Sequence, residues 1–157
     1  MQLALQQLIE MLTKKQLTIA TAESCTGGSL SSLLTSQSGA SAYFDRGFVT
    51  YSDQAKIDML GVDSAVLERF GAVSEQTAEQ MAQGIIAHAK TDIAVAITGI
   101  AGPTGGSKDK PIGMVCFGFC VLGRCFTHTQ QFSGNREAVV ISSVNFVIQA
   151  LVNELST

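Results

Sequence analysis

Residues 17–28 read Leu-Thr-Ile-Ala-Thr-Ala-Glu-Ser-Cys-Thr-Gly-Gly, and they form the first distinctive segment of the chain. Its first part, residues 17–21, combines β-branched and small apolar side chains and predicts a short strand. The Gly27-Gly28 pair then marks a turn, after which leucines recur at helical spacing from Leu30 to Leu34. A strand, a glycine-bearing turn and a helix in succession are typical of α/β domains, in which such turns carry functional groups.

Outward from this stretch, helical and strand-like segments follow one another along the chain. An amphipathic period predicts a helix from the N-terminus to about Lys15. Further helices are predicted after the caps Ser52 or Asp53, Asp63, Ser74 and the segment 133–136. Further strands are predicted at 47–51, 92–98, 112–121 and 124–132, with a turn at Leu122-Gly123 and the last strand at an edge. Together these elements predict a single three-layer α/β/α domain over residues 1–157, with a mixed sheet.

The composition describes a globular chain with a slightly acidic balance. Of its 157 residues, 46% are hydrophobic and 15% are charged, which excludes global disorder. The net charge of −3 argues against a nucleic-acid-binding surface, which needs clustered lysine and arginine. The N-terminus lacks the basic start of a signal peptide, and no apolar run approaches the length that spans a bilayer. We therefore expect a cytoplasmic protein that does not bind a membrane.

The cysteines give no sign of a cross-linked or metal-binding framework. Cys25, Cys116, Cys120 and Cys125 form no CxxC pair and no zinc-like spacing with the two histidines. Thiols of cytoplasmic proteins are mostly reduced. We therefore expect free, mostly buried thiols, and neither a disulfide nor a metal site.

Three segments end predicted strands and carry polar side chains that a turn does not require. They are residues 21–28, 51–56 and 98–106. In the first, Ser24 lies at a helix start, where unpaired backbone N–H groups could stabilise an oxyanion while its hydroxyl attacks a carbonyl. A simple helix cap by Ser24 or Thr26 is the alternative, and Cys25 is a close competitor as nucleophile. The G-x-S-x-G elbow and the P-loop pattern are both absent.

Lys56 is the best candidate for the base that such a nucleophile needs. It lies in the first turns of a predicted helix, and both that helix end and burial lower the pKa of a lysine. Tyr51 could orient or pass the proton. The alternatives are a surface lysine and an interfacial tyrosine without catalytic roles. His88 and His128 are predicted on a solvated helix side and an edge strand, so a Ser-His-Asp triad is not expected.

The glycine-rich segment 98–106 offers backbone donors with little side-chain bulk, as a phosphate or ribose cradle would. A tight structural connection before Pro111 is the alternative. Arg136 lies in the first turn of the last helix, where its charge opposes the helix dipole. A role in phosphate recognition therefore suits Arg136 better than a role in stability.

At these segments the chain resembles the C-terminal domain of the CinA family, the nicotinamide-nucleotide amidohydrolases. The resemblance runs through essentially the whole chain. The matching stretches are Thr21-Ala-Glu-Ser-Cys-Thr-Gly-Gly28, Gly47-Phe-Val-Thr-Tyr-Ser52 with Lys56, Gly71-Ala-Val-Ser74, Thr98-Gly-Ile-Ala-Gly-Pro-Thr-Gly-Gly106 and Lys110-Pro-Ile-Gly113.

The resemblance implies a hydrolase that converts nicotinamide mononucleotide and water to nicotinic acid mononucleotide and ammonia. It places the nucleophile on Ser24 rather than Cys25, the base on Lys56 and an assisting tyrosine on Tyr51. It implies no metal or other cofactor, and a homo-oligomer, for which a dimer is the expectation. The residues expected to bind the substrate are Cys25, Thr26, Gly27, Gly28, Thr98, Gly99, Gly102, Gly105, Gly106 and Arg136.

The chain departs from the family pattern at two points. Asn135 stands where an acidic residue is expected before the arginine. Some members carry an additional N-terminal domain that resembles molybdopterin-binding proteins, and we expect this chain to be the stand-alone form. Two rival functions are a non-catalytic nucleotide-binding module in competence or DNA-damage responses, and a hydrolase of a different amide.

Overall fold

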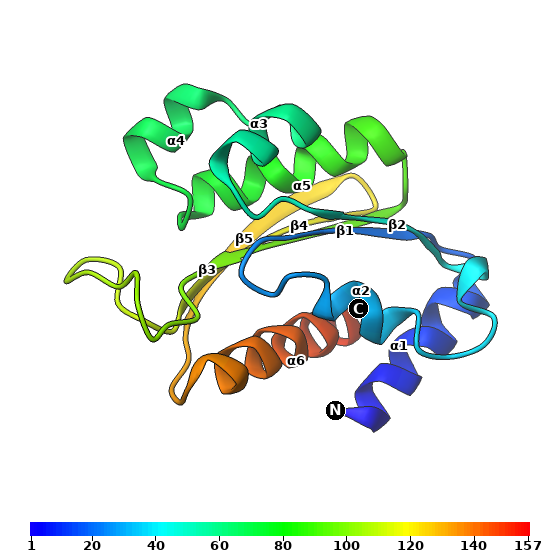
Figure 1. Cartoon of the computed structure of the whole chain (residues 1–157). Coiled ribbons are helices and arrows are strands. Elements are labelled where there is room, and N and C mark those ends of the chain that lie inside the picture. Colours follow the sequence, from blue (N-terminus) through cyan, green and yellow to red (C-terminus); the bar gives the residue numbers. More distant parts are fainter.

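A five-stranded mixed sheet forms the centre of the computed structural model, which describes residues 1–157 (Figure 1). Its strands are β1 (Ile19–Glu23), β2 (Phe44–Val49), β3 (Ile93–Gly99), β4 (Met114–Val121) and β5 (Arg124–Gln131). They lie in the order β2-β1-β3-β4-β5, with β1 parallel to both neighbours and the pairs β3/β4 and β4/β5 antiparallel. The prediction that the polar strand β5 lies at an edge is confirmed.

Helices cover both faces of this sheet (Figure 1). On one face lie α1 (Gln2–Lys15), α2 (Ser29–Leu34) and α6 (Arg136–Leu155), and on the other α3 (Asp53–Leu60), α4 (Ser64–Phe70) and α5 (Glu75–Ala89). A short 3-10 helix, Ala40–Ala42, precedes β2. The predicted single α/β/α domain, its mixed sheet and the order of its helices and strands are confirmed.

The two faces of the sheet carry side chains of different size. Toward α5, strands β1 and β3 present the small side chains of Ala20, Ala22, Ala94 and Ala96. Toward α1 and α6 the sheet presents larger ones, among them Phe117. Because alanine side chains are short, α5 lies close to the strands. A Cβ atom added at Gly118 would lie 2.1 Å from the Ala78 carbonyl oxygen.

The helices that position the site begin and end where the sequence predicts. The Ser52 hydroxyl caps α3 by accepting the Ala55 amide, and Gly61 ends that helix in the left-handed region with φ 69°. The Ser74 hydroxyl caps α5 by accepting the Thr77 amide. These caps are local interactions between residues a few positions apart, which is why the sequence reveals them.

Two strands are shifted from their predicted bounds. β1 begins at Ile19 rather than at residue 17, because the Leu17 amide donates to the Leu12 carbonyl and completes the end of α1. β2 spans Phe44–Val49 rather than 47–51, so Tyr51 lies beyond the strand, where the chain turns toward the cap of α3. Both shifts leave the polar residues of the predicted site at the carboxyl ends of their strands.

Helix α6 contradicts the expectation that no apolar run approaches membrane-spanning length. By length and composition, Arg136–Leu155 is apolar enough to cross a bilayer. Its buried side chains, including Val147 and Leu151, belong to the core between the sheet and α1. The apolar character of α6 is therefore explained by its packing as a core helix.

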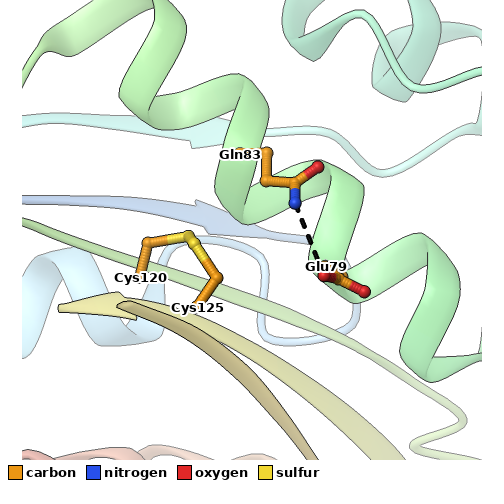
Figure 2. The surroundings of a disulfide bond; sticks show 4 residues. All are labelled: Glu79, Gln83, Cys120 and Cys125. Carbon is orange, nitrogen blue, oxygen red and sulfur yellow. Dashed lines mark hydrogen bonds between the residues drawn. A yellow bond between two sulfur atoms is a disulfide. The ribbon is translucent and has the colours of Figure 1, made fainter. Parts of the chain in front are cut away.

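A disulfide between Cys120 and Cys125 contradicts the expectation that all thiols are free. The two residues lie directly opposite each other on β4 and β5, with Cα atoms 4.1 Å apart, because the Leu122-Gly123 turn joins the strands after only two residues. Figure 2 shows the bond between these strands, near α5. Cys25 and Cys116 are free and buried, as expected.

Candidate active site

The three polar segments meet in a pocket of about 290 Å³ at the carboxyl ends of β1 and β3. The predicted residues that line it are Ser24, Cys25, Tyr51, Lys56, Thr98, Gly99, Gly102, Gly105 and Arg136. Four predicted substrate-binding residues do not line it, namely Thr26, Gly27, Gly28 and Gly106. This is the location that an α/β sheet favours, because strand ends and helix starts converge there.

Lys56 and Ser24 are in direct contact in this pocket. The Lys56 Nζ atom donates to Ser24 Oγ at 3.2 Å and to the Thr50 carbonyl at 2.9 Å, with a longer contact of 3.4 Å to the Ser52 carbonyl. Although a lysine is usually exposed, only 1% of Lys56 is accessible to solvent. The structure thus excludes the surface-lysine alternative.

The surroundings of Lys56 favour its neutral form. Burial lowers the pKa of Lys56 below its ordinary value of 10.5, and the opposing effects of Asp53 and Cys25 are smaller. No carboxylate forms an ion pair with Lys56, since the two ion pairs of the protein are Arg46–Asp45 and Arg124–Glu154. A neutral amine could donate its two N–H groups to the two carbonyls and direct its lone pair at Ser24 Oγ, so the geometry suits a base.

Cys25 differs from its neighbour Ser24 in making no hydrogen bond with Lys56. Burial raises the pKa of the Cys25 thiol to about 11, and only 9% of the residue is exposed. A thiol with this pKa remains protonated near neutral pH, and the thiolate is the nucleophilic form. The structure therefore favours Ser24 over Cys25 as the nucleophile.

Backbone amides after Ser24 are available to stabilise an oxyanion. The Ser24 amide donates to the Ile97 carbonyl, and the Gly27 amide donates to the Ser24 carbonyl. The amides of Cys25, Thr26 and Gly28 donate to no backbone carbonyl. Of these three residues, only Cys25 lines the pocket, so its amide is the leading candidate for an oxyanion donor.

Glu23 is a site-shaping residue that the sequence analysis missed. Its fully buried carboxylate accepts the Thr26 hydroxyl at 2.7 Å, the Leu30 amide at 2.8 Å, and both the amide and hydroxyl of Ser31. These bonds hold the turn that follows Ser24 against the start of α2. They also show that the Thr26 hydroxyl stabilises the turn and does not face the pocket.

Tyr51 contributes two different groups to the site. Its carbonyl lies 3.5 Å from Ser24 Oγ, while its hydroxyl accepts a 3.0 Å hydrogen bond from Arg136 Nη2. The hydroxyl makes no hydrogen bond with Ser24 or Lys56. Arg136 Nη1 donates to the Gly102 carbonyl at 2.9 Å. Arg136 thereby links the start of α6, the glycine-rich loop and Tyr51 around one edge of the pocket.

One wall of the pocket includes Ala72 and Val73, which were not predicted from the sequence as site residues. The Thr98 hydroxyl, only 1% exposed, donates to the Ala72 carbonyl at 2.8 Å and fixes this wall against β3. Thr98 thus has a structural partner as well as a place in the pocket lining. The stretch Gly71–Ser74 matches the family pattern, and this match was the feature of the sequence that could have indicated Ala72 and Val73.

Asn135, one of the departures from the family pattern, has a structural role. Its side chain caps α6 by accepting the Ala138 amide at 2.9 Å.

His88 and His128 are both exposed and lie outside the pocket. Nowhere in the chain do three His, Cys, Asp or Glu side chains gather closely enough to hold a metal ion.

The chain matches known proteins over nearly its whole length. The family model of the CinA C-terminal domain matches residues 2–155. The nicotinamide-nucleotide amidohydrolase PncC of Enterobacter agglomerans is 51% identical over 137 residues, which cover 87% of this chain and 84% of that protein. The protein of the same name from Escherichia coli (strain K12) is 45% identical over 147 residues, which cover 93% and 89%.

The fold agrees with this match. The crystal structure of a competence-damaged protein (CinA) superfamily member from Klebsiella pneumoniae 700603 superposes with a TM-score of 0.94 at 39% identity. The superposition covers 98% of this chain and 96% of that one. From its sequence and its fold alike, the chain belongs to the CinA C-terminal domain family.

Proposed function

We propose that this protein is a nicotinamide-nucleotide amidohydrolase, which converts nicotinamide mononucleotide and water to nicotinic acid mononucleotide and ammonia. The observation that carries the proposal is the 3.2 Å contact between Lys56 Nζ and Ser24 Oγ inside the pocket. Two relatives named for this activity share 51% and 45% identity with the chain over most of both proteins. The pocket geometry supports a Ser/Lys mechanism for this reaction.

In the first step, neutral Lys56 removes the Ser24 proton as Oγ attacks the carboxamide carbon of the substrate. The carbonyls of Thr50 and Ser52 hold the two N–H groups of Lys56, so that its lone pair faces the serine hydroxyl. The amide of Cys25 stabilises the negative charge on the tetrahedral oxygen.

In the second step, protonated Lys56 gives its proton to the leaving nitrogen, and ammonia departs from the Ser24 ester. Lys56, neutral again, then takes a proton from a water molecule that attacks the ester carbon. The second tetrahedral intermediate collapses, returns the proton to Ser24 Oγ and releases the carboxylic acid product. One Ser24–acyl bond forms and breaks per turnover, and the net change is one water consumed and one ammonia released.

The ribose phosphate of the substrate lies along the glycine-rich loop and Arg136 in this proposal. Arg136 lies at the pocket edge, and its guanidinium suits bidentate recognition of a phosphate. Binding of this remote group would orient an otherwise unreactive amide at Ser24. Tyr51 positions Arg136 through its hydroxyl, and it could assist proton transfer only if that hydroxyl left Arg136.

Ammonia release from nicotinamide mononucleotide by the purified protein tests the proposal. Ser24→Ala and Lys56→Ala are each expected to lower the rate by about a thousandfold or more, because each removes one member of the dyad. The exposed Ser38→Ala and Lys14→Ala serve as matched controls and should keep the native rate. Native turnover by Ser24→Ala would refute the assignment.

The same experiment distinguishes the rival functions. A protein that binds the nucleotide but releases no ammonia would be a binding module. Release of ammonia from another amide at a higher kcat/KM would identify a hydrolase of a different substrate.

We further propose that the protein works in the cytoplasm as a homodimer. An enzyme of nucleotide salvage needs access to the cytoplasmic nucleotide pool, and the family resemblance carries the expectation of a dimer. Cell fractionation and analytical ultracentrifugation test the two parts. Recovery with membranes would contradict the first, and a monomer at micromolar concentration would contradict the second.

A further inference from the structure

The β4–β5 hairpin is held together at its tip by more than its disulfide. Cys120 and Cys125 are flanked in the ladder by the pairs Val121–Arg124 and Phe119–Phe126. The Leu122-Gly123 turn has positive φ at both residues, 50° and 86°, as a tight two-residue hairpin requires. The strands therefore keep their register through backbone pairing and turn geometry, with the disulfide as an added cross-link.

The two sulfur atoms differ in their access to solvent. Cys120 is only 3% exposed, whereas Cys125 is an exposed residue on the edge strand. A cavity of about 560 Å³ adjoins both cysteines and is lined by the C-terminal half of α5 and the hairpin turn. Figure 2 shows the disulfide beside this part of α5, near Gln83. An attacking molecule can therefore reach the Cys125 sulfur from the cavity or from the open edge of the sheet.

We propose that Cys120–Cys125 is a site of thiol–disulfide exchange with small-molecule thiols, and that Cys125 is the sulfur attacked. A thiolate attacks Cys125 Sγ and forms a mixed disulfide, and the Cys120–Cys125 bond breaks to release Cys120 as a thiolate, which takes a proton from solvent. A second thiolate attacks the outer sulfur of the mixed disulfide and releases Cys125 as a thiolate, which is then protonated. The protein gains two electrons and two protons, and the two small thiols become one disulfide.

This site is separate from the Ser24 pocket. Cys120 pairs with Ala94 near the start of β3, whereas Gly99, which lines the pocket, pairs with Val115 near the other end of β4. The proposal therefore does not rest on the proposed amidohydrolase function. Neither Cys25 nor Cys116 competes in the exchange, because both are buried.

Counting alkylated cysteines by peptide mass spectrometry tests the exchange on the whole folded chain. Protein prepared without reductant should show no alkylation at Cys120 or Cys125. Treatment with dithiothreitol under native conditions should make the exposed Cys125 reactive, while the buried Cys25 and Cys116 remain unlabelled. The proposal is wrong if Cys125 is already alkylated before reduction, or if it becomes reactive only after denaturation.

Two matched variants test which sulfur is attacked. In Cys120→Ser, oxidised glutathione should form a mixed disulfide on the exposed Cys125. In Cys125→Ser, the buried Cys120 should react about tenfold or more slowly. Equal rates, or faster reaction of Cys120, would overturn the assignment of Cys125. Circular dichroism spectra that match the native protein would show that both variants are folded.

Discussion

The side-chain nitrogen of Lys56 lies 3.2 Å from the hydroxyl oxygen of Ser24, across 32 positions of sequence. Ser24 follows strand β1, and Lys56 projects from the first half of α3 on the alanine face of the sheet. The other close partners of the nitrogen are backbone carbonyls, which carry no formal charge. The dyad thus places a buried amine against the nucleophile without a carboxylate to hold its proton.

The first prediction concerns the pH dependence of ammonia release. Only neutral Lys56 can accept the Ser24 proton, so kcat/KM should rise with pH through the pKa of this lysine. Because burial lowers that pKa, the inflection should lie below 10.5. Lys56→Arg should lose activity at every pH, since a guanidinium remains protonated. A native profile that shows no rise with pH would contradict the role of Lys56.

The second prediction concerns stability. The unfolded chain binds the Lys56 proton more tightly than the folded one, so this residue destabilises the fold below its folded pKa. The penalty disappears as pH rises toward 10.5. At neutral pH, Lys56→Met should therefore raise the free energy of unfolding by about 1 kcal/mol. Urea unfolding at several pH values measures this difference, which should shrink with rising pH; a constant difference would contradict the prediction.

The third prediction concerns Glu23. Glu23→Gln replaces one carboxylate oxygen with an NH₂ group that faces donors, so the free energy of unfolding should fall by about 1–3 kcal/mol. The turn after Ser24 should also lose its fixed position, which lowers kcat more than it raises KM. Glu10→Gln, at an exposed position of α1, should change neither the free energy of unfolding nor kcat appreciably. A stable variant with native kcat would show that the buried charge is dispensable.

The fourth prediction concerns Arg136. Arg136→Met should raise KM for nicotinamide mononucleotide about 10- to 100-fold, the range for loss of a charge-assisted contact to phosphate. The same variant should act on the nucleoside without phosphate about as well as the native protein. Tyr51→Phe, which removes only the hydroxyl partner of Arg136, should have a smaller effect on KM. If KM rose equally for the nucleotide and the nucleoside, Arg136 would act by holding the Gly102 carbonyl and not by binding the phosphate.

Local signals account for most of what the sequence predicted about the fold. Serine caps and a glycine stop are encoded within a few residues, so the bounds of α3 and α5 followed from Ser52, Gly61 and Ser74. Strand bounds depend on pairing with distant residues, and β1 and β2 were accordingly shifted. The residues 21–28, 51–56 and 98–106 converge because each follows a strand that ends on the same side of the sheet.

Two features of the chain were not predicted from the sequence. Glu23 binds groups three, seven and eight positions ahead, and its role required the path of the turn. The disulfide was within reach of sequence reasoning, since a two-residue turn at Leu122-Gly123 places Cys120 opposite Cys125. The expectation of reduced thiols rested on the missing CxxC spacing and on a cytoplasmic location, left that geometry out, and was wrong.

The unequal side chains on the two faces of the sheet should shape how this protein tolerates sequence change. On the alanine face, added volume meets backbone, as at Gly118 beneath the Ala78 carbonyl. Between the helices that cover this face, a Cβ atom at Gly84 would lie 2.1 Å from the Leu60 carbonyl oxygen. On the face that carries Phe117, a smaller side chain at one position can be offset by a larger one beside it. We therefore expect the layer that holds Lys56 to tolerate fewer substitutions than the layer beneath α1 and α6.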